Sequence, residues 1–161
     1  MRKLAILLVP AAIAASVMAL RPATDDSYSV VEGVWKSVEV TVTTSDSTYT
    51  NEVTQPNLLV LTKRHFAAMF IVGAEPRPEL PDEPSDELLL AAWRPFRANA
   101  GTYEVSGSEM TSKVIVSKNP NSTAEQREYT SAFELEGDVM HRTFTSGTTG
   151  DELRVKYVRV E

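Results

Sequence analysis

The feature that most constrains this chain is a two-residue alternation that begins at Val34. Trp35, Ser37, Glu39 and Thr41 fall on one face of an extended segment, and the other face carries Val34, Val38, Val40 and Val42. Side chains of a β-strand point alternately to opposite sides, so this pattern predicts a strand that is buried on one side.

The rest of the chain repeats short apolar segments between turn-forming clusters rich in Gly, Asn, Asp and Ser. Short connections favour antiparallel neighbours in up-and-down order. With the first strand, the chain is predicted to be all-β with eight strands. Such a set closes into a barrel that side chains fill or that holds one small ligand. The further predicted strands are 58–63, 66–72, 102–105, 109–118, 125–135, 139–145 and 152–160.

One short helix is predicted between residues 85 and 94. Prolines between 75 and 81 exclude regular structure there, Ser85 suits an N-cap, and the apolar residues that follow recur at helical spacing. Strands 58–63 and 66–72 are apolar on both faces, so we expect this helix to pack on the barrel wall or over one mouth. A helix lying on a membrane surface is the alternative, which its acidic polar face disfavours.

The first 19 residues are typical of an export signal. Arg2 and Lys3 precede an apolar run that ends in Val17-Met18-Ala19, a small-x-small cleavage site. We therefore expect a cleaved signal peptide at 1–19, a flexible tether at 20–30 and one barrel domain at 31–161. An uncleaved signal anchor is the alternative. The expected location is the periplasm or the medium, without stable membrane insertion after cleavage.

Composition excludes several classes of site. The chain has no Cys, which rules out disulfides, thiol nucleophiles and a lipid-anchored export signal. Its net charge is −6, and removal of Arg2 and Lys3 makes it more acidic still. This balance disfavours nucleic acid as a partner. His65 and His141 are isolated histidines, expected at the surface, so neither a metal nor a cofactor is predicted.

Three short motifs resemble the bacterial lipocalin-like domain family, a member of the calycin group. They are Gly33-x-Trp35 at the first strand, Ala-Gly-Thr-Tyr-Glu-Val at 100–105 and Phe-Glu-Leu-Glu-Gly-Asp at 133–138. The resemblance implies an eight-stranded barrel that binds a small apolar or amphipathic molecule. It also implies that Gly33 and Trp35 help to close the barrel floor.

Trp35 alternates out of phase with the valine face, which leaves two geometries open. A β-bulge near Lys36 and Ser37 would turn both Trp35 and the later valines inward. Without a bulge, Glu39 would point into the lumen and need a partner, for which Arg159 in the last strand is the candidate.

The apolar phase of each strand predicts the residues that line the lumen. Small-ligand pockets often combine apolar walls with a few placed polar groups, and here Arg127 and Arg142 share the apolar phase and would suit an anionic head group. The alternative is that the aromatic side chains fill a solid core and the arginines lie at the rims. The predicted set is Phe66, Phe70, Arg127, Tyr129, Phe133, Met140, Arg142, Phe144, Val155 and Tyr157.

Three classes of function follow from this pattern. The first is an exported carrier that sequesters a small apolar or amphipathic, in some cases anionic, molecule. The second is an isomerase, cyclase or lyase on the same barrel, for which Glu39, Glu104 and Tyr129 are the titratable candidates; no recognised catalytic motif is present. The third is a filled barrel that acts as a protein-interaction module. Oligomeric state is left open.

Overall fold

The computed structural model describes residues 30–147 and 149–161. The predicted signal peptide and all but the last residue of the predicted tether lie outside the described residues. Within the described ranges, no helix has the length and apolarity needed to cross a membrane. The elements are β1 (Gly33–Thr43), β2 (Thr48–Glu52), β3 (Asn57–Leu61), β4 (His65–Ile71), α2 (Asp86–Trp93), β5 (Phe96–Ser106), β6 (Glu109–Ser117), α3 (Pro120–Ala124), β7 (Glu128–Glu136), β8 (Val139–Thr145) and β9 (Glu152–Arg159).

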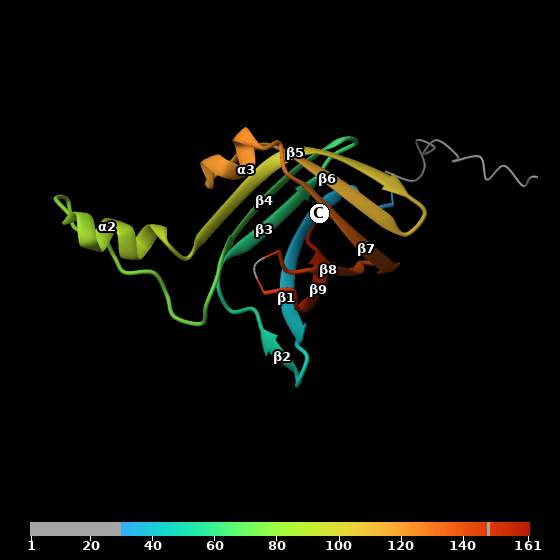
Figure 1. Ribbon diagram of the computed structural model, residues 1–161, viewed down its shortest axis with the longest axis horizontal. Coiled ribbons are helices and arrows are strands. Elements are labelled where there is room, and N and C mark those ends of the chain that lie inside the picture. Colours follow the sequence, from blue (N-terminus) through green and yellow to red (C-terminus); the bar gives the residue numbers. More distant parts are fainter. Residues whose placement is uncertain (1–29, 148) are drawn as a thin grey trace, which may run out of the picture.

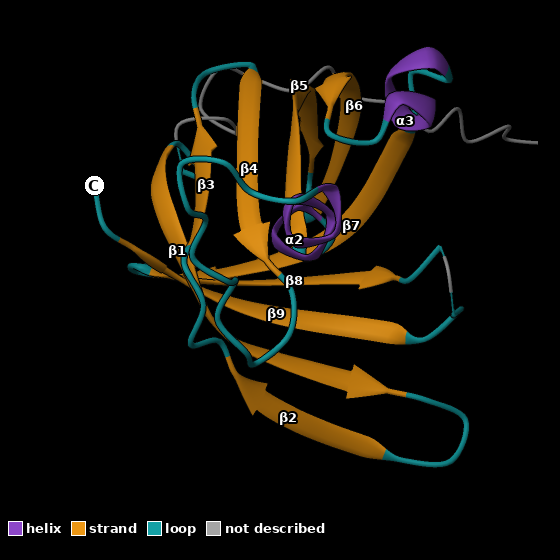
Figure 2. Ribbon diagram, turned by 90° about the vertical axis from the view of Figure 1, so that its left-hand side faces the viewer, coloured by secondary structure: helices purple, strands orange, loops and turns teal. Residues whose placement is uncertain are grey.

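Eight of the nine described strands close into a barrel. Each strand from β3 to β9 pairs antiparallel with the next, β1 pairs with β3, and β1 also pairs with β9 to close the ring. Figure 2 shows β3 to β6 running steeply and β1, β8 and β9 crossing beneath them. The predicted all-β, up-and-down barrel with eight strands is therefore confirmed.

The ninth strand, β2, was not predicted. The long strand β1 has two partners along one edge: Gly33–Trp35 pairs with β3, and Glu39–Thr43 pairs with β2. The sequence of β2 is polar and every residue in it is exposed, so it lacks the apolar alternation that revealed the other strands. Two predicted strand starts were also wrong, since β5 begins at Phe96 and β7 begins at Glu128. A short helix, α3, takes the place of the predicted turn at 119–121.

A β-bulge in β1 resolves the phase of Trp35. The pairing of β1 with β9 shifts register between Ser37 and Glu39, so of the two predicted geometries the structure has the bulge near Lys36 and Ser37. Trp35 and Ser37 are buried before the shift, and Val40 lies opposite the buried Val155 after it. The Asn57 side chain secures the bulged segment: its Oδ1 accepts from the Ser37 N–H at 2.6 Å, and its Nδ2 donates to the Ser37 carbonyl at 3.0 Å.

The end of the barrel at Trp35, called the floor here, is closed by Trp35, Arg159 and Gly33. The Trp35 ring is fully buried, its Nε1 donates to the Val31 carbonyl at 2.9 Å, and the Arg159 guanidinium stacks over it at 4.1 Å. Arg159 also donates to Asp138 at 3.1 Å. Gly33 has a φ of +137°, and a Cβ there would lie 2.5 Å from the Glu161 carbonyl oxygen. A residue with a side chain would therefore be strained and would clash with the chain end.

The buried core occupies the floor half of the barrel. Val31 precedes β1, the other members come from inward-facing positions of β1 and β3 to β8, and Tyr157 of β9 packs against them. At Gly101 of β5 the backbone of β6 approaches so closely that a Cβ would lie 1.9 Å from the Lys113 carbonyl oxygen. The core comprises Val31, Trp35, Leu59, Leu61, Phe66, Tyr103, Val105, Met110, Val114, Phe133 and Met140.

The predicted helix is present as α2, between β4 and β5. Ser85 is its N-cap, and the Ser85 hydroxyl accepts from the Leu88 N–H at 3.3 Å. Figure 1 shows α2 extending beyond the ends of β4 and β5, clear of the barrel, so the prediction that it packs on the barrel wall or over one mouth is wrong. Ala92 is its buried residue, whereas Leu89, Leu90 and Trp93 are 42, 50 and 55% exposed. Much of the apolar surface of this helix therefore faces solvent.

Candidate functional site

Exposure of the inward-facing side chains increases from the floor to the opposite end, called the mouth here. Met140 of β8 is fully buried near the floor. Farther along the same strand, Arg142 and Phe144 are only partly buried. At the mouth, Phe70 is 37% and Tyr129 is 43% exposed. The barrel is therefore packed at one end and more open at the other, where aromatic side chains border the mouth.

Arg142 lies between these two regions and points inward from β8. Its Nη2 and Nε donate to the Ser131 hydroxyl of β7 at 2.8 and 3.1 Å. The Ser131 hydroxyl lies 3.4 Å from the Met110 carbonyl, to which it donates. Protein surrounds the guanidinium so completely that burial lowers the pKa of Arg142, an effect that the nearby Tyr157 opposes. The residue nevertheless keeps some accessible surface.

No carboxylate neutralises Arg142 within the described part of the chain. Arg127, Arg154 and Arg159 each pair with an acidic residue, whereas the titratable group that affects Arg142 is the Tyr157 phenol. Burial also raises the pKa of Tyr157, while Arg142 acts to lower it. Tyr157 therefore stays neutral at physiological pH, and the inward-facing positive charge has no anionic partner. Buried charges normally have one.

Three buried serines add to the polar part of the interior. Ser37 of β1, Ser112 of β6 and Ser131 of β7 are 9, 6 and 3% exposed. No buried side-chain polar atom in the described ranges lacks a hydrogen-bond partner. Sequence reasoning overlooked these serines because it sought aromatic and charged groups. The two-residue alternation could have identified them: Ser131, for example, lies two residues before the inward-facing Phe133 and so points to the same side of β7.

The structure divides the predicted lumen residues into groups. Phe66, Phe133 and Met140 are buried in the core cluster. Phe70 and Tyr129 border the mouth, and Phe144 lies partly buried near it. Val155 is buried beside Arg142 across the strand pair. Of the predicted residues, Arg142 and Tyr157 bring polar groups together inside the barrel. The predicted floor residues Gly33, Trp35 and Arg159 lie together at the opposite end.

Arg127 lies outside the lumen, contrary to the predicted placement. It precedes β7 and is exposed, and its Nε donates to the Glu125 carboxylate at 3.0 Å. This hydrogen bond is the main cause that raises the pKa of Arg127. The reason for the different position is helix α3, which the sequence analysis missed. Gln126, directly after it, adopts a left-handed φ of 47° and delays the start of the strand.

The groups considered for acid–base chemistry do not gather in the lumen. Glu39 lies opposite Lys156, out of phase with the inward-facing Val40. Glu104 is exposed on the outer face of β5, and Tyr129 is at the mouth. In the described ranges, no three His, Cys, Asp or Glu side chains come close enough to hold a metal ion.

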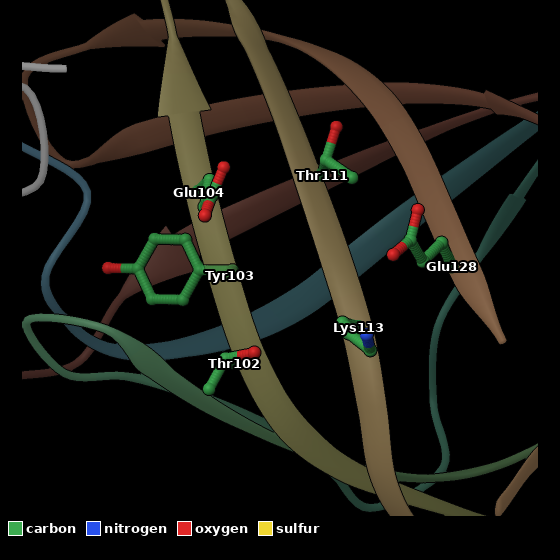
Figure 3. Close-up of a pocket in the computed structure, with 6 residues that line it drawn as sticks. All are labelled: Thr102, Tyr103, Glu104, Thr111, Lys113 and Glu128. Atoms are coloured by element: carbon green, nitrogen blue, oxygen red, sulfur yellow. The ribbon is translucent and has the colours of Figure 1, made fainter. Parts of the chain in front are cut away.

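Two hollows lie on the outer surface of the protein. One, of about 270 Å³, is lined by Thr102, Tyr103, Glu104, Thr111, Lys113 and Glu128 on β5, β6 and β7 (Figure 3). The other, of about 420 Å³, lies under the proline-rich segment and includes Ile71, Arg77 and Ala92. None of the predicted lumen residues lines either hollow.

No family model matches the chain, and no curated protein matches it. A lipocalin-like protein from Bacteroides uniformis has a similar structure, with 11% identity and a TM-score of 0.45 over 80% of this chain and 97% of that one. An uncharacterized protein from Bacteroides eggerthii is similar over 78% and 97%, with 12% identity and a TM-score of 0.43. The strand order and the pairing of β1 with β9 in this chain themselves establish a closed eight-stranded up-and-down barrel.

The barrel interior combines apolar walls with a few polar groups, a composition that is common in small-ligand pockets. An inward-facing guanidinium beside a neutral phenol and buried hydroxyls provides hydrogen-bond donors.

Proposed function

We propose that this protein is an exported carrier that binds a small amphipathic molecule, with its apolar part toward the mouth and an anionic group against Arg142. The observation that carries the proposal is an enclosed Arg142 guanidinium without a carboxylate partner. A ligand carboxylate or similar anion would supply the missing charge and accept charge-assisted hydrogen bonds. Phe70, Tyr129 and Phe144 offer the apolar part of the ligand an aromatic surface.

Export is the part of the proposal that rests on the sequence alone. The basic start, apolar run and small-x-small site predict cleavage after Ala19. Cell fractionation with amino-terminal sequencing of the recovered protein provides the test. A mature chain that begins at Leu20 outside the cytoplasm would support export, and an uncleaved chain in the membrane fraction would contradict it.

Ligand binding is tested with the mature domain purified from its natural compartment. Native mass spectrometry would reveal a co-purifying small molecule. In parallel, a fluorescent fatty acid is displaced by an unlabelled fatty acid or by the alcohol of equal chain length. We expect the acid to compete at micromolar concentrations and the alcohol to be about 10 to 100 times weaker, because only the acid supplies a charge to Arg142.

Phe133→Trp provides a steric test of the same site. Phe133 is 8% exposed and lies opposite Arg142 across β7 and β8, so a larger ring there should exclude the ligand. Leu58→Trp, on the outer wall where the residue is 37% exposed, is the matched control. Equal affinity for acid and alcohol, or no displacement by either, would refute the proposed carrier function.

A further inference from the structure

A second unpartnered apolar surface lies on the outside of the barrel. Residues that alternate with the buried side chains of β3 to β6 point outward and align in two rows across the strands. One row runs from Leu58 through Met69 to Ala98, and the other runs from Val60 through Ala67 and Ala100 to Val116. We call these seven residues the outer wall patch. Leu58, Met69 and Val116 are 37, 39 and 58% exposed.

Helix α2 presents the complementary apolar surface. Leu89 and Trp93 are one helical turn apart and, with the adjacent Leu90, form an exposed stripe. Leu80 in the preceding loop is also 48% exposed. We call residues 75–93 the α2 arm. The same molecule therefore carries an apolar sheet face that no helix covers and an apolar helix surface that packs on no sheet.

The arm is held away from the outer wall patch of its own barrel. The Lys118 ammonium lies 4.8 Å from the Trp93 ring and donates to the carbonyls of Trp93 and Phe96, the latter at 2.9 Å. Trp93 and Phe96 also pack with ring centroids 6.2 Å apart. On the other side of the helix, the Val72 N–H donates to the Pro95 carbonyl at 2.9 Å. These contacts secure the carboxyl end of α2 at the start of β5, where it points outward (Figure 1).

We propose that two copies of this chain form a reciprocal dimer, in which the α2 arm of each copy packs on the outer wall patch of the other. Fully exposed, a large apolar residue presents on the order of 150–200 Å². Seven residues of the arm and patch are 37–58% exposed, and together they would bury roughly 500–600 Å² of apolar surface per copy by that measure. A standard stable interface needs about 800 Å² per partner, which a polar rim would complete. The seven are Leu58, Met69, Leu80, Leu89, Leu90, Trp93 and Val116.

Charge favours the same pairing. The arm is strongly acidic, with Arg77 as its single basic residue and six acids at Glu75, Glu79, Asp82, Glu83, Asp86 and Glu87. The polar border of the patch includes Lys113 and the hairpin residues Lys63 and Arg64. In the hollow of Figure 3, Glu128 lies opposite Lys113, and Glu104 lies farther along β5, opposite Thr111. Beside the patch, the three basic residues therefore outnumber the acidic Glu128. A wall of one copy thus meets an arm of opposite charge from the other.

The test uses the mature domain and two variants, each defective in one half of the contact. Leu90→Glu disables the arm and Val116→Glu disables the patch, because a carboxylate buried in an apolar contact loses its hydration. Val160→Glu is the control, since Val160 is 54% exposed but lies outside both surfaces. Mass is measured by analytical ultracentrifugation from 1 to 200 µM, and circular dichroism checks that each variant folds.

We expect the unmodified domain to dimerise with a dissociation constant on the order of 10 µM. Each defective variant should dimerise at least about 30-fold more weakly, and the control should match the unmodified domain. When the two defective variants are mixed, one intact contact remains, in which the normal arm of the patch variant meets the normal patch of the arm variant. Heterodimers should therefore form although neither variant dimerises alone.

Trp93 gives an independent readout, because Trp35 is fully buried and Trp93 is the second of the two tryptophans. Its emission should shift to the blue as concentration rises. A monomer at 200 µM would overturn the proposal, as would a concentration-independent blue emission, which would mean that the arm covers its own wall. Failure of the mixed variants to pair would also overturn it. So would binding of the arm to phosphatidylcholine vesicles with no dimer in solution.

Discussion

Replacement of Arg142 by methionine should make the protein more stable and its ligand affinity lower. The guanidinium donates two hydrogen bonds to one acceptor, the Ser131 hydroxyl, and hydrogen bonds that involve a charged group contribute about 1.5–3 kcal/mol. Enclosure of an unpaired charge costs several kcal/mol. Methionine has a similar length and is apolar, so removal of the charge outweighs the loss of the bonds.

The expected gain in the free energy of unfolding is about 1–2 kcal/mol, which raises the midpoint of thermal unfolding by roughly 3–8 °C. Urea unfolding with linear extrapolation measures the free energy, and calorimetry measures the midpoint. Ser131 keeps the Met110 carbonyl as a hydrogen-bond acceptor at 3.4 Å, so the substitution leaves the Ser131 hydroxyl with a partner. In the displacement assay, affinity for the fatty acid should fall about 10- to 100-fold, while affinity for the matched alcohol should stay the same.

Arg154→Met is the matched control for this experiment. Arg154 lies on the neighbouring strand β9, where its side chain is 41% exposed and pairs with Glu134 at 2.7 Å. Exposed ion pairs contribute little, so the free energy of unfolding should change by less than about 1 kcal/mol. Loss of stability in Arg142→Met, together with unchanged discrimination between acid and alcohol, would refute the argument that Arg142 is an unneutralised charge held for a ligand.

Three further predictions concern the barrel itself. Asn57→Ala removes both hydrogen bonds that secure the bulge and should cost about 2–3 kcal/mol of unfolding free energy in urea, whereas Asn51→Ala on the exposed strand β2 should be nearly neutral; equal effects would contradict this role. Gly101→Ala should cost about 2–3 kcal/mol or more because its Cβ would meet the β6 backbone, while Gly147→Ala, with open space around it, should be tolerated; a stable Gly101→Ala variant would mean that the two strands separate easily. Burial raises the pKa of Tyr157 above its ordinary value of 10.0, so the native state holds the phenol proton more tightly than the unfolded state does. The free energy of unfolding should therefore fall as pH rises above about 10, by up to roughly 1.4 kcal/mol per pH unit. Tyr157→Phe should lose this part of the pH dependence.

Local sequence pattern was sufficient for most of the barrel. Alternation in β1, the turn clusters between later strands and the spacing around Ser85 predicted eight barrel strands and helix α2, since these features depend on neighbouring residues. The bulge in β1 followed from the conflict between Trp35 and the valine phase. Strand β2 escaped prediction because it gains its place by hydrogen bonding to β1 rather than by burial of an apolar face.

The candidate site depended on tertiary structure. Arg127 and Arg142 looked alike in sequence, both on an apolar phase, yet α3 and the turn at Gln126 leave Arg127 at the surface, where it pairs with Glu125. Arg142 is enclosed because β7 and β9 bring Ser131 and Tyr157 to it from positions 11 and 15 residues away in the sequence. Sequence periodicity determines which way a side chain points from its strand. What it meets there depends on strand register and on the ends of neighbouring elements, and only the folded chain determines those.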